Sequence, residues 1–113
     1  MQTVVDRLLK GETVTFRPSG NSMSPLIHPG DQVTVKPVIR MREGGLHYPT
    51  PLAKSKEGEK VNFLEVGDIV ICMVKGRLLL HKITDITSDY RYQIGNNKGY
   101  INGYASAIYG VKI

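Results

Sequence analysis

The sequence lacks several features that would place it in a common class of protein. Its 113 residues include one cysteine, Cys72, and no tryptophan. A single cysteine excludes a disulfide within the chain, so nothing argues for an oxidising compartment. No apolar run approaches the roughly 20 residues of a membrane span, and Asp6, Arg7 and Lys10 interrupt any secretory signal at the N-terminus. We therefore expect a cytoplasmic protein without a membrane span.

Metal-binding patterns and basic tracts are also sparse. The three histidines, His28, His47 and His81, lack the close spacing of a zinc site, so we expect no metal and no other cofactor. The formal net charge of +5 would suit a nucleic-acid-binding protein. The basic residues are scattered, however, so we interpret the richest segment, 36–60, as a solvated loop and do not expect a nucleic-acid partner.

The rest of the composition predicts a small β domain. Hydrophobic residues make up 41% of the chain, enough for one core, and twelve glycines and six prolines divide it into short segments. We expect a single domain over residues 1–113, with mainly antiparallel, coiled or barrel-like sheets. A short helix is expected at 3–10, capped by Thr3 and ended by Gly11. Strands are expected at 13–17, 32–35, 69–74, 78–86, 90–94 and 107–113.

Turn residues separate the expected strands. Val66-Gly67-Asp68 and Lys75-Gly76-Arg77 predict two turns, the second of them a hairpin. Segment 36–60 holds three prolines and three glycines, and its strand pattern fails. We predict a long loop insertion there, which either forms a lid or one wall of a substrate groove, or is disordered.

The segment from Ser19 to Val35 runs from a loop into a strand. A serine in such a loop can present its hydroxyl while nearby backbone N–H groups point at the same position, as acyl transfer requires. Ser-Gly-Asn-Ser is by itself a common loop composition. The longer order Gly-x-Ser-Met-x-Pro, then Gly-Asp and a strand, resembles the nucleophile box of the signal peptidase and LexA-type peptidases. The resemblance implies that Ser22 is the nucleophile, with Ser24 a weaker candidate.

The same resemblance suggests an oxyanion hole made by the backbone. Bacterial signal peptidases often place a serine two residues before the nucleophile, but here that position is Gly20. The N–H of Ser22 is then the best donor, and an N–H of the Gly20–Asn21 turn can assist it.

A histidine lies in the second segment of interest, Leu78 to Ile83. Alone, a histidine among leucines is most often a hydrogen-bonded core residue. Neighbouring side chains of a strand point to opposite faces, so only one of His81 and Lys82 can meet Ser22. In the endoplasmic-reticulum and archaeal signal peptidases a His-Arg pair stands here, and His81-Lys82 is similar to it. That likeness implies that His81 is the general base.

The third segment, Gly95-Asn96-Asn97, is similar to the Gly-Asp-Asn box of these peptidases. In the histidine-dependent members, this box and a position six residues beyond its aspartate supply carboxylates to the histidine. Here Asn96 and Asn102 occupy those positions. An amide can orient an imidazole but cannot balance its positive charge, and loss of the aspartate can lower kcat about 10⁴-fold in Ser-His-Asp enzymes. Both asparagines are equally compatible with turns.

Taken together, the resemblance implies a serine endopeptidase that acts on an extended peptide or protein substrate, often with small residues beside the cut. Such peptidases usually carry a membrane anchor or a DNA-binding domain before the nucleophile box. We expect neither here, because no apolar stretch approaches a membrane span and the residues before Ser22 are too few for a helix-turn-helix domain. Several origins are compatible with this expectation, such as a phage or mobile-element protein. Two alternatives stay open. One is a catalytically silent peptide-binding module of the same fold, and the other is a nucleic-acid-binding protein.

Overall fold

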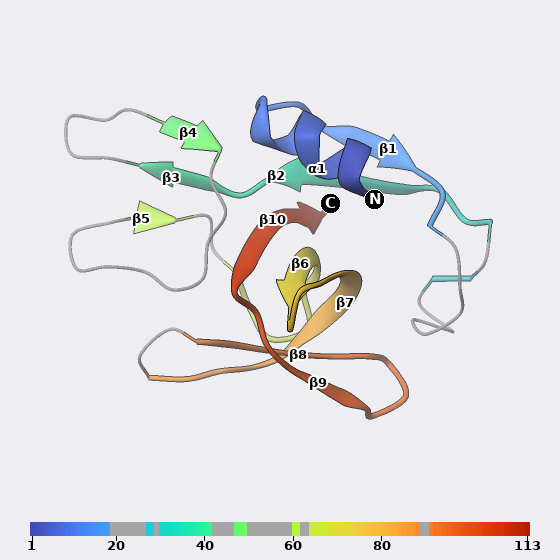
Figure 1. Ribbon diagram of the computed structural model, residues 1–113, viewed down its shortest axis with the longest axis vertical. Coiled ribbons are helices and arrows are strands. Elements are labelled where there is room, and N and C mark those ends of the chain that lie inside the picture. Colours follow the sequence, from blue (N-terminus) through green and yellow to red (C-terminus); the bar gives the residue numbers. More distant parts are fainter. Residues whose placement is uncertain (19–26, 29, 42–46, 50–59, 62–63, 89–90) are drawn as a thin grey trace.

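The computed structural model of the protein describes residues 1–18, 27–28, 30–41, 47–49, 60–61, 64–88 and 91–113. Within these residues the chain forms mainly β structure with one short N-terminal helix, as predicted (Figure 1). The elements in chain order are α1 (Gln2–Leu9), β1 (Val14–Phe16), β2 (Val33–Pro37), β3 (Ile39–Met41), β4 (His47–Pro49), β5 (Lys60–Val61), β6 (Ile69–Val74), β7 (Arg77–Ile86), β8 (Tyr92–Gly95), β9 (Ile101–Tyr104) and β10 (Ala107–Lys112).

Helix α1 packs its apolar side against β1, β2 and β10. Val5 and Leu8 are buried on this side. Gly11 follows the helix with a φ of 89°, a backbone conformation that favours glycine, so the predicted end is confirmed. The predicted cap is wrong, because the helix begins one residue before Thr3. Met1 is the N-cap residue, and no side chain caps the helix.

Seven strands form one antiparallel sheet in the order β1-β2-β10-β6-β7-β8-β9. The middle strand, β6, pairs with β10 on one edge and with β7 on the other. After β9 the chain turns at Ser106, whose backbone N–H donates to the carbonyl of Met73 in β6 at 2.8 Å. It then returns as β10, so the half of the sheet from β6 to β9 curls back toward β6 (Figure 1).

Buried side chains form two clusters on the two faces of this sheet. Adjacent residues of β6 alternate between them, with Val70 and Cys72 in one and Ile71 in the other. The inner cluster comprises Val38, Val70, Cys72, Val74, Ile83, Tyr92, Ile94, Ala105, Ile108 and Val111. The helix-side cluster comprises Val5, Leu8, Val14, Ile27, Val33, Val35, Ile71 and Leu80. The site described below lies on the inner side of β7.

The two turns predicted around β6 are both present. Lys75 and Gly76 have φ values of 51° and 78° and join β6 to β7 as a two-residue hairpin loop, whose positive φ angles match the twist of the strands. Before β6, the backbone N–H of Glu65 donates to Oδ2 of Asp68 at 2.9 Å, and the N–H of Asp68 donates to the carbonyl of Glu65 at 3.1 Å.

Segment 36–60 is more regular than predicted. Strand β2 continues to Pro37, and β3 pairs with β4 and β5 in a separate three-stranded sheet of order β4-β3-β5. The prediction of an uninterrupted loop is therefore wrong for these stretches. Pro49 is compatible with pairing because it ends an edge strand, where its missing N–H breaks no ladder. Residues 42–46 and 50–59 of the predicted loop lie outside the described residues.

Strand β9 is an addition to the expected strands, because its residues belong to the asparagine-rich segment 95–103, in which the glycines and asparagines indicate turns. Strand β8 begins at Tyr92 rather than at residue 90, which itself lies outside the described ranges. In the part of the chain that the structure describes, no helix has the length and apolar character needed to cross a membrane.

Candidate functional site

Strand β7 places two adjacent polar side chains on opposite faces of the sheet. His81 is buried, with 9% of its surface exposed, and lies between Leu79 and Ile83 on the side of the inner cluster. Lys82 lies on the other side, where its Nζ donates to Oδ1 of Asn97 at 3.3 Å. The alternation expected of a strand thus separates the histidine from the lysine.

Asn102 reaches His81 because β9 contains a β-bulge. Ile94 pairs with Gly103 and Gly95 pairs with Ile101, so Asn102 is an extra residue on β9 that has no partner on β8. A bulge re-aims the side chain of the extra residue. Oδ1 of Asn102 lies 2.7 Å from Nδ1 of His81.

This hydrogen bond selects one tautomer of the imidazole. A carboxamide oxygen can only accept, so Nδ1 of His81 carries the proton and donates it to Oδ1 of Asn102. The neutral ring then has its lone pair on Nε2, the atom that can take a proton from a hydroxyl group. The pair has no carboxylate, so it provides orientation without a full negative charge.

Asn96, the other asparagine suggested to orient the histidine, holds a turn. Its Oδ1 accepts the backbone N–H groups of Lys98 at 2.8 Å and Tyr100 at 3.0 Å. Its own backbone N–H donates to the carbonyl of Tyr100 at 2.9 Å. The structure therefore brings Asn102 to His81 and places the Asn96 side chain in the loop between β8 and β9, in line with the turn interpretation.

Described residues anchor both ends of the loop between β1 and β2. Arg17 Nη1 donates to the carbonyl of Gly30, and the backbone N–H of His28 donates to Oδ2 of Asp31 at 2.9 Å. Ile27 is 5% exposed and belongs to the helix-side cluster. The residues predicted to form the nucleophile and the oxyanion hole lie inside this loop and outside the described residues: Gly20, Asn21, Ser22 and Ser24.

The lone thiol is a core residue. Cys72 is fully buried on β6, and burial raises the pKa of its thiol to about 12. A thiol in that environment is a poor nucleophile, so the prediction of a buried structural cysteine is confirmed. The described ranges contain no group of three or more His, Cys, Asp or Glu side chains that could hold a metal ion. Asp85, near His81 in sequence, is exposed.

No protein-family model, no curated protein and no solved structure matches this chain. The resemblance to signal peptidase and LexA-type peptidases therefore rests on the sequence motifs.

Two features of the site were missed in the sequence. The Lys82–Asn97 contact joins β7 to the loop before β9, and no local pattern indicates it. The sequence contains one signal for the bulge, which is the Asn102-Gly103 pair. Gly103 has a φ of 134°, a backbone conformation that residues with a side chain rarely adopt.

Proposed function

We propose that the protein is a serine endopeptidase of the signal peptidase and LexA type, with Ser22 as nucleophile and His81 as general base. The observation that supports it most directly is the hydrogen bond from Nδ1 of His81 to Oδ1 of Asn102. A base needs an oriented ring whose lone pair lies on the working nitrogen, and this bond fixes both the orientation and the tautomer of the ring. A cytoplasmic location is part of the proposal, since the only thiol is buried and needs no oxidising compartment.

In the proposed reaction Oγ of Ser22 attacks the carbonyl carbon of an extended peptide. Nε2 of His81 takes the hydroxyl proton and later passes it to the leaving amine. The backbone N–H of Ser22, assisted by one from the Gly20–Asn21 turn, stabilises the oxyanion. Asn102 keeps the imidazole in the required tautomer. Small substrate residues beside the cut are the preference that the resemblance implies.

A second candidate function has a specific observation in its favour. The partner of His81 is an amide, which cannot offset the positive charge that develops on the ring. The same fold without activity would be a peptide-binding module. The two functions differ in whether Ser22 becomes covalently modified.

A serine-reactive phosphonate probe separates the two candidates. We expect it to label the protein at Ser22 and expect Ser22→Ala to abolish both labelling and peptide cleavage, with the fold unchanged by circular dichroism. Ser24→Ala is the matched control from the same loop and should keep most of both. A folded protein that the probe does not label, or a Ser22→Ala variant with full activity, would refute the peptidase proposal.

Replacing Asn102 by aspartate tests the proposed role of the pair. Aspartate keeps the acceptor for Nδ1–H and adds a negative charge, so Asn102→Asp should raise kcat/KM by at least about tenfold, given the much larger effect of the reverse change in Ser-His-Asp enzymes. Asn96→Asp is the control and should leave kcat/KM unchanged, because the Asn96 side chain holds the turn before β9. Equal effects of the two substitutions would argue against Asn102 as the positioning residue.

A further inference from the structure

Exposed apolar side chains gather on and beside β9. Tyr100, Ile101 and Tyr104 are 64%, 46% and 38% exposed, and they are three of the seven large hydrophobic residues exposed in the described part of the chain. The other four are scattered over both ends of the chain, helix α1 and the turn before β6. Exposed apolar side chains that lie together often mark an interaction surface, whereas scattered ones are normal on a protein surface.

The bulge in β9 gives this strand two functional faces. Asn102 turns toward His81, while Ile101 and Tyr104 on either side of the bulge remain exposed. The end of the Ile101 side chain lies over Gly95, with Cδ1 3.2 Å from the position that a Cβ atom would take there. We call the two exposed side chains of this strand, Ile101 and Tyr104, the β9 face.

The outer edge of β9 pairs with no second strand among the described residues. Among the described residues β9 is the last strand of the seven-stranded sheet and pairs only with β8 (Figure 1). The strand at the other end of the sheet, β1, has α1 packed against it. Natural edge strands are commonly protected by lysine or proline, and β9 contains neither.

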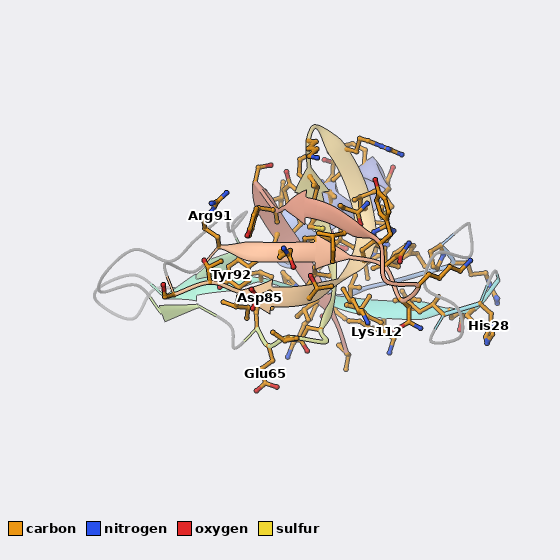
Figure 2. The ribbon with its side chains drawn as sticks, turned by 90° about the horizontal axis from the view of Figure 1, so that it is seen from below. His28, Glu65, Asp85, Arg91, Tyr92 and Lys112 are labelled. Atoms are coloured by element: carbon orange, nitrogen blue, oxygen red, sulfur yellow. The ribbon has the colours of Figure 1, made fainter. Side chains whose placement is uncertain are left out.

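Basic residues surround this edge. The guanidinium of Arg91 lies 4.1 Å from the centre of the Tyr104 ring, and Figure 2 shows Arg91 beside the start of β8. The Lys75 side chain approaches Gly103, with its Cε 3.3 Å from the position of a Cβ atom there. Lys98 is exposed in the loop before β9, and residues 91–113 contain no aspartate or glutamate. A second copy of this edge would be repelled, whereas an acidic chain would be attracted.

We propose that the β9 edge binds an acidic, extended peptide segment of a partner protein by strand addition. Backbone groups of the segment would pair with β9, its apolar side chains would contact Ile101 and Tyr104, and its carboxylates would meet Arg91 and Lys98. Peptide binding here does not depend on the peptidase activity proposed for Ser22, because the β9 face lies on the other side of the strand from the Asn102–His81 pair.

The test uses a fluorescein-labelled peptide of alternating valine and glutamate, with binding measured by anisotropy on the full chain and on its Ser22→Ala variant. We expect equal binding to both, and at least about tenfold weaker binding to Tyr104→Ser and to Arg91→Ala. Val66→Ser, which removes an exposed apolar side chain from the turn before β6, is the control and should bind normally.

Further probes test the mode of binding and the kind of partner. A peptide N-methylated at alternate amides on the pairing edge should lose binding, whereas the isomer methylated on the opposite edge should keep it, because only one edge of an added strand pairs with β9. The same peptide with lysine for glutamate should bind at least about tenfold less tightly. Equal binding of both methylated isomers, preference for single-stranded oligothymidylate, or dimerisation through β9 without peptide would each overturn the proposal.

Discussion

At His81, a single hydrogen bond decides which ring nitrogen can act as a base. The Asn102 carbonyl oxygen accepts from Nδ1, so the amide supplies the tautomer that an aspartate supplies in Ser-His-Asp enzymes. What the amide lacks is charge. We therefore expect a working but slow site, rather than one disabled by the wrong tautomer.

The identity of the base can be tested at the two adjacent residues of β7. His81→Ala should remove most of the activity, because Lys82 lies on the opposite face and cannot replace it. Lys82→Ala should keep most of the activity, since its side chain contacts Asn97 instead. An essential Lys82 with a dispensable His81 would reverse the assignment.

Cys72 makes stability depend on pH in the alkaline range. Burial raises the pKa of its thiol from 9.0 to about 12 in the folded protein. Between these values the unfolded chain binds fewer protons than the folded chain, so stability is fully present below pH 9 and falls as pH rises, by at most about 1.4 kcal/mol per pH unit.

A Cys72→Ala variant isolates this effect from other alkaline titrations. At roughly pH 8 the variant should be less stable than the natural protein, because alanine leaves a cavity. By roughly pH 10.5 the difference in free energy of unfolding should shrink by about 2 kcal/mol. Urea unfolding at both pH values measures it, and a constant difference would contradict the role of the buried thiol.

At the scale of the element, the β8–β9 pair shows how a local irregularity builds a site. The extra residue in β9 breaks the alternation, directs Asn102 inward and leaves Ile101 outward. Gly95 faces this irregularity from β8. A Cβ atom there would lie 2.6 Å from the carbonyl oxygen of Tyr100 and 2.9 Å from Cγ2 of Thr84.

Gly95→Ala should therefore destabilise the protein by about 1–3 kcal/mol, the usual cost of overpacking. Thr84→Ser removes Cγ2 while keeping the hydroxyl that donates to Gln93, so it serves as the matched partner in a double-mutant cycle. The double variant should be more stable than the sum of the two single effects predicts. Strict additivity in urea unfolding would show that Thr84 does not cause the strain.

At the scale of the whole molecule, the chain forms two sheets that differ in how far their strands are paired and packed against buried side chains. Strand β6 is paired on both edges and has a buried cluster on each face. The small sheet of β3, β4 and β5 pairs only within itself in the described residues. Stability should therefore be unevenly distributed over the molecule.

Native-state hydrogen exchange can measure that difference. Amides of β6 should exchange only through global unfolding, while amides of β3, β4 and β5 should exchange at least about a hundredfold faster, because opening a small edge sheet exposes little core. The hairpin amides at Lys75 and Gly76 are an internal reference for exposed backbone. Protection of β3 equal to that of β6 would show that the two sheets unfold as one unit.

Local chemistry determined much of this architecture in advance. The apolar run of β6, the positive-φ turn at Lys75-Gly76 and the helix end at Gly11 are confirmed because each depends on neighbouring residues alone. Alternation also placed His81 and Lys82 on opposite faces, since strand side chains have a period of two. The assignment of Ser22 as nucleophile stays a prediction that comes from the sequence motif.

Tertiary structure decided what no local pattern contains. Pairing among β3, β4 and β5 gives strand structure to stretches whose prolines and glycines predicted a loop. The choice of Asn102 over Asn96 as the partner of His81 depends on a one-residue register shift between β8 and β9, and a register belongs to two strands rather than to either sequence segment. The sequence motif offered Asn96 and Asn102, two residues with the same chemistry. Only the tertiary arrangement of β7, β8 and β9 brings Asn102 within hydrogen-bond distance of His81.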